Sequence, residues 1–446
     1  MHNASRFVRI TAVSAGVAAA LAFGQAYGAA FQLKENSAKG LGRAFAGSAS
    51  APDDASIIAN NAAGMRLLDG SQFQFDVSAI SFGAKYHGDG GQYVTGQPIS
   101  GGNGGNAGTT APVPAAYFHL PFGENNNMHF GASLTVPYGF KTEYDKHWTG
   151  RYHGIKTELQ AVDAALAFSY DVNPYVSFGG SVFAERLDVD LSSAMDLGTA
   201  LYGKVPGFTP GSADAFNRIK AHNTEVGYTL GALFTIVDGT NFGLSYRSQV
   251  KHKIDDGTAR FSAETTAGTQ ALAVLQSQGL FVDSKGRANI ILPASATASF
   301  THRVNERWTV MADVSRTAWS KFDQVLVQLD SGQTLPLAFN YRDTTFVSIG
   351  SDYRLSDTLT LRGGLALDQT PTTDAHRDVR VPDTSRKWLS LGLSWAPSEK
   401  AEYSVGYTHL FTRDPKIDLT SAYATTLAGS YDVTGDVLAL AVKYKF

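Results

Sequence analysis

The sequence predicts an all-β fold, a transmembrane antiparallel β-barrel of about 14 strands, and three observations lead to this prediction. After residue 70, apolar and polar residues alternate with period two, as they do along a strand. Short and long connections alternate between these segments, which is typical of outer-membrane barrels with tight periplasmic turns and larger extracellular loops. The chain also ends in VLALAVKYKF, an alternating segment whose last residue, Phe446, is aromatic.

The composition excludes several classes of protein. Charged residues make up 17% and aromatic residues 11% of the 446 residues, and the mean hydropathy of -0.12 is too low for a helical membrane protein. The formal charge is -3 and no segment supplies a clustered basic footprint, so no nucleic-acid partner is expected. Cysteine is absent, which removes disulfides, thiolate metal sites and cysteine nucleophiles, and which suits an exported protein.

The N-terminus predicts export. Arg6 and Arg9 precede an apolar run at residues 10–24, and AYG at residues 26–28 supplies the small residues of a cleavage site. We therefore predict that residues 1–28 are a signal peptide that is cleaved after its last residue. A retained anchor helix is the alternative, but a spanning helix needs roughly 20 apolar residues.

The next segment, residues 29–70, lacks the alternation. It is rich in Gly, Ala, Ser and Asn, and its short apolar pieces suit brief helices and turns rather than strands. A barrel of about 14 strands has a lumen too wide for side chains to fill. The segment therefore lies either outside the barrel or inside it, and the wide lumen favours the inside.

The barrel itself is expected over residues 71–446. Strands are expected near residues 73–86, 111–122 and 128–142, and eleven more after residue 159. Hairpin turns are expected at DVNP (171–174), at Asp238-Gly239, at residues 354–357 and at APSEK (396–400). Long loops are expected at about residues 187–224, 253–288, 319–342, 370–386 and 413–432.

A soluble β-sandwich is the alternative fold, because its inward face produces the same alternation. The signal peptide, the aromatic strand ends and the loop asymmetry favour the barrel. In the closing strand, Leu438, Leu440 and Val442 are then expected to face lipid. The resemblance of this closing strand to those of outer-membrane proteins implies that Phe446 serves as a signal for the outer-membrane barrel assembly machinery.

Several motifs in the same order closely resemble the FadL-type family of outer-membrane transporters of long-chain fatty acids and hydrocarbons. These motifs are FQLKENSAKGLGRAFAGSA, DDAS, NNAAGM, VPYGFKTEYDKHWTGRY, LSYRSQVKHK, NYRDT and RVPDTSRKWLSLG, and they span essentially the whole mature chain. The resemblance implies a barrel of 14 strands, a hatch that plugs its lumen and energy-independent uptake of hydrophobic molecules. In the NNAAGM motif, Ala62 replaces the proline that the family usually has after Asn61, so the rigidity of this hatch is left open.

Pro137 and Gly139, in SLTVPYGF, interrupt an otherwise alternating segment. Proline cannot donate to a ladder and glycine weakens a strand, so the strand is expected to be bent or interrupted here. It either ends at its extracellular tip or leaves a lateral gap in the wall. The resemblance favours a gap, and it implies that Asn61 braces it.

The expected ligand-binding residues come from three places. Phe31 lies in the hatch, and apolar pieces within two long loops supply Leu201 and Phe208 (LYGKVPGF) and Leu280 and Phe281 (ALAVLQSQGLF). Exposed apolar loop residues indicate a binding surface, although these loops could instead pack on each other.

A carboxylate ligand would also need a cation. Arg342 in NYRDT is the first candidate and Arg247 the second, because arginine can hold a carboxylate through two parallel hydrogen bonds. An ion pair of Arg342 with Asp343 is the alternative.

Other motifs favour no catalytic or cofactor chemistry. Asp53 and Asp54 are adjacent and diverge, and no nucleophile elbow, metalloprotease motif or phosphate loop is present. The glycine-rich run at residues 101–108 lacks the Lys-Ser/Thr of a phosphate loop. Lys251-His252-Lys253 is read as a strand end facing anionic lipopolysaccharide, with metal binding as the weaker alternative. No enzyme activity, cofactor or metal is therefore expected.

The sequence thus predicts capture of a hydrophobic ligand by extracellular loops, an apolar lumen pocket, a hatch rearrangement and lateral exit through a strand gap in the bacterial outer membrane. A general diffusion porin for polar solutes is the main alternative, although an open polar lumen would not need residues 29–70. An outer-membrane lipase lacks a recognisable motif. The identity of the ligand and the oligomeric state stay open.

Overall fold

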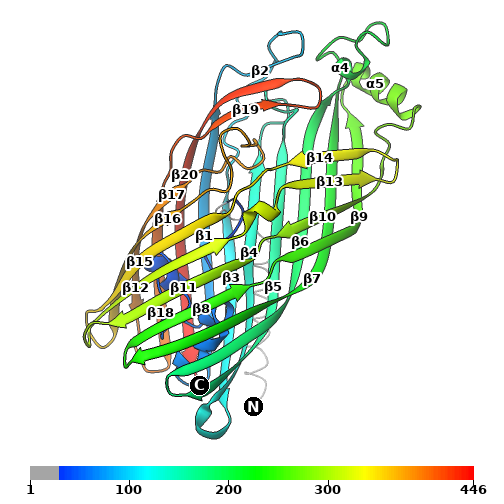
Figure 1. Cartoon of the computed structure of the whole chain (residues 1–446). Coiled ribbons are helices and arrows are strands. Elements are labelled where there is room, and N and C mark those ends of the chain that lie inside the picture. Colours follow the sequence, from blue (N-terminus) through cyan, green and yellow to red (C-terminus); the bar gives the residue numbers. More distant parts are fainter. Residues whose placement is uncertain (1–29) are drawn as a thin grey trace, which may run out of the picture.

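The structure is a computed structural model that describes residues 30–446, and the predicted signal peptide lies outside the described residues. The chain forms a closed antiparallel barrel of 14 strands, in which the last strand pairs with the first. Figure 1 shows that short turns gather at one end of the barrel, while long loops extend from the other end. The predicted fold class is therefore confirmed.

The barrel wall consists of strand segments of very different length. Their bounds are β1 Gln72–His87, β2 Gly91–Gln92, β3 Thr110–Phe122, β4 Met128–Glu143, β5 Lys156–Asn173, β6 Val176–Asp196, β7 Asp214–Val237, β8 Thr240–Arg247, β9 Val250–Ala263, β10 Ser284–Leu292, β11 Ser295–Arg303, β12 Trp308–Thr317, β13 Gln324–Leu329, β14 Thr334–Ala338, β15 Thr344–Arg354, β16 Leu359–Asp368, β17 Arg386–Trp395, β18 Ala401–Phe411, β19 Lys416–Thr420 and β20 Thr426–Lys445. Several pairs of segments lie in line as one barrel strand: β8 with β9, β10 with β11, β12 with β13, β14 with β15, and β18 with β19. The short segment β2 pairs with β20 above the wall.

The described helices are all short. They are α2 Ala38–Gly42, α3 Ile57–Asn60, α4 Leu197–Leu201 and α5 Thr266–Gln276, with 3-10 helices η1 Ala62–Leu67, η2 Glu124–Asn126 and η3 Trp319–Lys321. Among residues 30–446, no helix combines the length and the apolar character that crossing a membrane requires.

The turns and loops follow the expected order, but four of the five expected loops are wrong in extent. The four predicted hairpin turns lie between β5 and β6, β7 and β8, β15 and β16, and β17 and β18. The expected loops at residues 187–224 and 253–288 are wrong in extent, because β6 and β7 continue to Asp196 and from Asp214, and β9 and β10 continue to Ala263 and from Ser284. The expected loops at residues 319–342 and 413–432 likewise contain β13, β14, β19 and the start of β20.

These long strand ends were missed because their outward residues are charged rather than apolar. Asp190 on β6 accepts hydrogen bonds from Arg218 Nε at 2.9 Å and from Lys156 Nζ at 3.0 Å on the neighbouring strands. The inward residues Leu187 and Val189 stay buried. An outward face of this kind suits water, so the strands rise beyond the apolar band of the wall.

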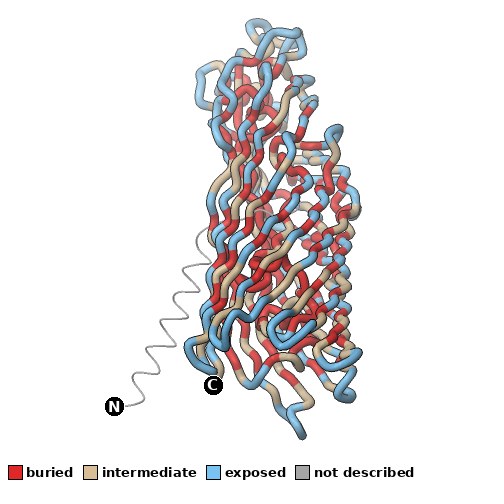
Figure 2. Tube along the Cα trace, turned by 90° about the vertical axis from the view of Figure 1, so that its left-hand side faces the viewer, coloured by how far each residue is buried: buried red, intermediate tan, exposed pale blue. Residues whose placement is uncertain are grey.

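Within that band the outward face is apolar. Figure 2 shows buried and exposed positions alternating along the strands. In β20, Leu438, Leu440 and Val442 are exposed, whereas Val437 and Ala439 are fully buried. This is the arrangement of a lipid-facing barrel wall, whose outer surface is covered by lipid rather than by water.

Residues 30–70 contribute no strand to the wall and run through the barrel interior (Figure 1). Helix α2 contacts β1 and the strands β16, β17, β18 and β20, whereas η1 contacts β4, β5, β6 and β7 on the opposite side. The segment therefore bridges the lumen from one wall to the other. We call residues 30–34 the strap and residues 35–70 the base.

Candidate functional site

A cluster of packed apolar side chains fills the half of the barrel nearest the long loops, and we call this cluster the chamber. Its buried members include Leu201 of α4, and the half-buried side chains of Phe208, Leu280 and Phe281 pack against the same cluster. Phe31 of the strap, 2% exposed, belongs to it as well. The structure therefore brings together the five apolar residues that the sequence singled out.

Aromatic rings surround Phe31 inside this chamber. Its ring centroid lies 4.6 Å from that of Trp319 and 5.0 Å from that of Phe322, both in edge-on contact. Tyr341 lies 5.8 Å from Trp319 and 5.5 Å from Phe322. Edge-to-face aromatic contacts each add about 0.5–1.5 kcal/mol beyond area burial, so Phe31 holds the strap in this chamber.

The wall beside the strap is interrupted at β4. The ladder between β3 and β4 ends at Ala116 and Leu134, although β4 continues to Glu143. On its other edge, β4 pairs with β5 with a register shift between Thr135 and Tyr138. The strand does not end at Pro137, and beyond Leu134 its edge toward β3 lacks the β3 ladder.

The strap occupies that vacant edge. Gln32 pairs with Tyr138 in an antiparallel bridge. Leu33 N donates to Pro137 O at 2.8 Å, and Gly139 N donates to Phe31 O at 2.8 Å. Proline has no N–H of its own, so the strap satisfies the groups that remain at the kink.

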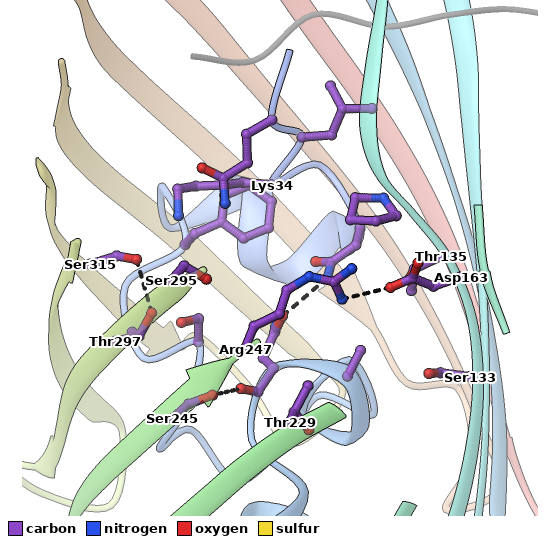
Figure 3. A pocket seen from close by; sticks show the side chains of 18 of the residues that line it. Lys34, Ser133, Thr135, Asp163, Thr229, Ser245, Arg247, Ser295, Thr297 and Ser315 are labelled. Carbon is purple, nitrogen blue, oxygen red and sulfur yellow. Dashed lines mark hydrogen bonds and ion pairs between the residues drawn. The ribbon is translucent and has the colours of Figure 1, made fainter. Parts of the chain in front are cut away.

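Below the strap lies a polar cavity of about 130 Å³ (Figure 3). Its floor and walls carry hydroxyl groups from the barrel strands: Ser133, Thr135, Ser181, Thr229, Ser245, Ser295, Thr297 and Ser315. Val136 and Pro137 of the kink border it, so the cavity reaches the inner face of the interrupted wall.

Arg247 enters this cavity from the end of β8 and is already paired. Its Nη1 donates to Asp163 at 2.6 Å and its Nη2 donates to Glu185 at 2.6 Å. The second Glu185 oxygen lies 3.0 Å from His252 Nε2, and the guanidinium stacks 4.0 Å above the Phe183 ring. Two carboxylates therefore hold the terminal nitrogens of the arginine that the sequence proposed as second head-group candidate.

Lys34 of the strap enters the same cavity and is not paired in this way. Its Nζ lies 4.4 Å from the centroid of the Phe346 ring, and within residues 30–446 no carboxylate oxygen lies within 4.0 Å of it. Burial lowers the pKa of the Lys34 ammonium from its ordinary value, and Asp368, Asp313 and Glu35 oppose this shift. The cavity thus contains one ammonium without a close counter-ion in the described part of the chain.

Buried ion pairs fix the base to the opposite wall. Lys39 Nζ lies 2.7 Å from Glu402 of β18, and Arg43 Nη1 lies 2.9 Å from Asp352 of β15. Within the base, burial alone would raise the pKa of Asp53, but Lys39, Arg43, Arg362 and Lys443 hold it well below its usual range. Asp53 is therefore part of an electrostatic anchor.

Wall glycines let the base approach the barrel backbone closely. A Cβ at Gly364 would lie 2.3 Å from the carbonyl carbon of Arg43, and a Cβ at Gly243 would lie 2.0 Å from Ala49 O. A side chain at any of Gly131, Gly179, Gly231, Gly350, Gly392 and Gly406 would likewise come within 3.0 Å of a base atom. Glycine in a strand commonly marks such a close backbone approach, and the base therefore fits its wall tightly.

The remaining predicted residues lie apart from the chamber. Arg342 has an exposed side chain, and its neighbour Asp343 pairs with Arg316 instead. Asn61 donates through Nδ2 to Ala49 O at 2.8 Å and to Ala232 O of β7 at 3.1 Å, so it braces the base rather than the β4 kink.

Ala62 follows Asn61 as the first residue of η1. In the basic run, His252 is buried and its neighbours Lys251 and Lys253 are exposed. Among residues 30–446, no group of three or more His, Asp or Glu side chains is arranged to hold a metal ion.

Sequence reasoning missed Lys34 and the wall glycines. Lys34 sits in a polar stretch without any local feature that separates it from a solvated lysine. Glycines inside strand patterns do carry a signal, because they suggest close backbone approach, and this signal could have located the base against the wall.

Comparisons with known proteins agree with this architecture. The family described as Outer membrane protein transport protein (OMPP1/FadL/TodX) matches residues 19–446. The long-chain fatty acid transport protein of Escherichia coli O6:H1 (strain CFT073) is 31% identical over 411 residues, which cover 88% of this chain and 89% of that protein. The crystal structure of a Pseudomonas aeruginosa FadL homologue superposes with a TM-score of 0.88 at 27% identity, covering 93% of this chain and 99% of that one. The Ralstonia pickettii toluene transporter TbuX shares the fold, with a TM-score of 0.62 at 20% identity over 91% and 99% of the two chains.

Proposed function

The chain belongs to the outer membrane transport protein family of FadL and TodX, and from this premise we propose that it takes up long-chain fatty acids or similar hydrophobic compounds across the bacterial outer membrane. The family consists of transport channels. The long loops lie on the cell exterior, and the apolar chamber beneath them receives the ligand.

Capture in the chamber needs no energy source. Burying a methylene is worth about 0.8 kcal/mol, so a chain of about 15 methylenes gains on the order of 10 kcal/mol on leaving water. The same gain makes release the difficult step. A ligand leaves only if the chamber changes shape, and Phe31 on the strap is the chamber residue best placed to cause that change.

The observation that carries this proposal is that the strap fills the edge of β4 from which β3 is absent. When the strap leaves, the chamber opens sideways through the wall. On the lipid side, just below the end of the β3–β4 ladder, lies an apolar depression of about 380 Å³ lined by Phe118, Leu134 and Leu166. An apolar molecule that leaves there passes into lipid without entering water.

A disulfide between strap and wall tests this proposal. Gln32 and Tyr138 are opposite residues without mutual backbone hydrogen bonds, and such pairs have Cα atoms roughly 4.5 Å apart, within reach of a disulfide. The chain has no cysteine, so Gln32→Cys with Tyr138→Cys forms the one possible bridge. We expect the oxidised double variant to lose uptake of a radiolabelled long-chain fatty acid in cells that lack their own transporter, and to regain it on reduction.

The two single cysteine variants are the controls, because each carries the same side-chain change without the bridge. Wild-type uptake by protein that gel mobility shows to be fully oxidised would contradict a moving strap.

A general diffusion porin is the rival function, and conductance separates it from the proposed one. A hatch that bridges the lumen should leave single-channel conductance in planar bilayers low, and deletion of residues 31–65 should raise it. Steady conductance by the intact protein would favour the porin.

We also propose the outer-membrane surroundings as partners. The exposed Lys251 and Lys253 on β9 suit contact with anionic lipopolysaccharide, and Phe446, 63% exposed at the end of β20, suits recognition by the barrel assembly machinery. Replacing Phe446 with Ala should lower the amount of folded barrel in the outer membrane.

A further inference from the structure

We propose that Lys34 is a receptor for an anionic head group, so that the protein distinguishes carboxylates from neutral molecules of the same chain length. This inference rests on the proposed function and refines its ligand class.

The ammonium of Lys34 has no close counter-ion in the described part of the chain. An ammonium partly removed from water is costly unless it is paired, and the half-buried Lys34 has no carboxylate within 4.0 Å of its Nζ among residues 30–446. Its contact with the Phe346 ring at 4.4 Å is a cation–π interaction, which replaces only part of the lost hydration. An anion bound in the cavity would complete the site.

The neighbouring acids are engaged elsewhere. Asp313 accepts from Gly47 N at 2.7 Å, from Ser48 N at 3.1 Å and from the Ser299 hydroxyl at 2.6 Å. Asp368 lies 3.7 Å from Arg386.

Glu35 accepts from the backbone N–H of Lys34 at 2.8 Å rather than from its ammonium. None of these carboxylates therefore neutralises Lys34 directly.

The cavity around Lys34 is lined by hydroxyl groups that can donate to an anion. Figure 3 shows Ser133, Thr135 and Ser295 around the same space as Lys34, and within residues 30–446 their hydroxyls make no side-chain hydrogen bond. Hydroxyl donors that line the same cavity as an ammonium suit the two oxygens of a carboxylate. A cavity of about 130 Å³ has room for a head group but not for a long alkyl chain.

Arg247 is the natural competitor for this role, and its environment argues against it. Asp163 and Glu185 each accept from one of its terminal nitrogens at 2.6 Å, so an incoming carboxylate meets two negative charges there. In the described part of the chain, no carboxylate lies that close to Lys34 Nζ. Because Lys34 belongs to the strap, a head group bound to it acts on the segment whose departure opens the wall.

The test compares two probes with one chain length, dodecanoate and 1-dodecanol, on the purified mature protein in nonionic detergent. Lys34→Met keeps an unbranched side chain and removes the charge. We expect calorimetric titration to give about a tenfold weaker affinity for dodecanoate, as loss of a charged hydrogen bond predicts, with dodecanol affinity unchanged. Lys34→Arg should keep the wild-type ratio of acid to alcohol affinity.

Exposed Lys251→Met is the matched control for loss of one positive charge. Folding is checked by the shift in gel mobility between unheated and heated samples. Lys34→Met should fold normally because it removes an unpaired charge. An unchanged ratio of acid to alcohol affinity in Lys34→Met would overturn the assignment, even if both affinities fall together. Wild-type protein that binds neither probe would instead overturn the proposed function itself.

Discussion

The strap and the base belong to one hatch, but they are attached to the wall by different contacts. Between the base and the wall lie buried ion pairs, such as Lys39 with Glu402 at 2.7 Å and Arg43 with Asp352 at 2.9 Å, and glycine contacts without room for a side chain. The strap is attached by single hydrogen bonds and by the ring of Phe31. The base is therefore the more firmly attached part, and this supports the proposal that the strap is the part that moves.

This difference bears on the direction of transport. A ligand that moved straight down the lumen would have to break buried ion pairs, and each broken pair costs about 3–5 kcal/mol. A ligand that moves sideways only has to displace hydrogen bonds that are worth about 0.5–1.5 kcal/mol each. This difference supports the proposed exit of the ligand through the kink in β4.

The largest expected effect comes from removing ion pairs that attach the base to the wall. Arg43→Met removes the nearer cation of Asp352 and one of the cations around Asp53, and leaves Arg362 as the remaining ion-pair partner of Asp352. We expect a loss of about 3–5 kcal/mol in the free energy of unfolding, measured by urea titration in detergent, and a raised single-channel conductance. Arg316→Met, which breaks an exposed pair with Asp343, is the control and should change stability by less than about 1 kcal/mol. Equal losses in both variants would mean that the base is no anchor.

The next effect tests the close contact between wall and base. Gly364→Ala places a Cβ 2.3 Å from the carbonyl carbon of Arg43, whereas the Cβ of Gly363→Ala meets its nearest atom, Ser390 O, at 4.0 Å. The two residues are neighbours on β16 and face opposite sides. We expect Gly364→Ala to lose about 1–3 kcal/mol of stability and Gly363→Ala to change little in the same titration. If Gly364→Ala is as stable as its neighbour, the base has more freedom than its contacts imply.

The sequence predicted the wall better than the hatch, for a physical reason. Lipid imposes an apolar outer face on every strand, so residues such as Leu438 and Leu440 reveal their orientation by alternation alone. Where strands rise above the lipid, Asp190 and Arg218 replace the apolar residues, and the pattern that marks a strand disappears. The error in loop bounds therefore coincides with the edge of the membrane.

The site was predicted only where a local signal existed. Apolar pieces such as those around Leu201 and Phe281 are unusual in loops, and this marked them as a binding surface or as a contact between the two loops. The pairing of Gln32 with Tyr138 joins residues far apart in sequence, and the role of Lys34 depends on that pairing. Neither the alternation nor any sequence motif indicates which acids surround Arg247. Its ion pairs with Asp163 and Glu185 could therefore be found only from the structure.

A smaller effect is expected when one wall hydroxyl that contacts the strap is removed, and the same change at the base serves for comparison. Thr317 on β12 donates to Gln32 Oε1 of the strap at 3.0 Å, whereas Thr301 on β11 shares a hydrogen bond with Ser50 of the base at 2.7 Å. Replacing Thr317 with Val removes about 0.5–1.5 kcal/mol from the closed strap, so fatty acid uptake should rise about two- to tenfold if strap release limits the rate. Thr301→Val is the same change at the base and should leave the uptake rate unaltered. A similar increase in both variants would remove the distinction between the two regions.

The smallest effect concerns Ala62, where the related proteins were expected to carry proline. Ala62 is the first residue of η1, directly after the capping residue Asn61, and proline is favoured at that position because its fixed φ suits the helix start. Ala62→Pro should therefore raise the free energy of unfolding by about 0.4–1 kcal/mol, mainly by restricting the unfolded chain. Ala63→Pro is the control: it removes the N–H that donates to Asn61 Oδ1 at 3.2 Å, and it should destabilise the protein instead. Because η1 belongs to the base, uptake by Ala62→Pro should equal that of the wild type. A changed uptake rate in a folded, more stable variant would mean that the base also moves during transport.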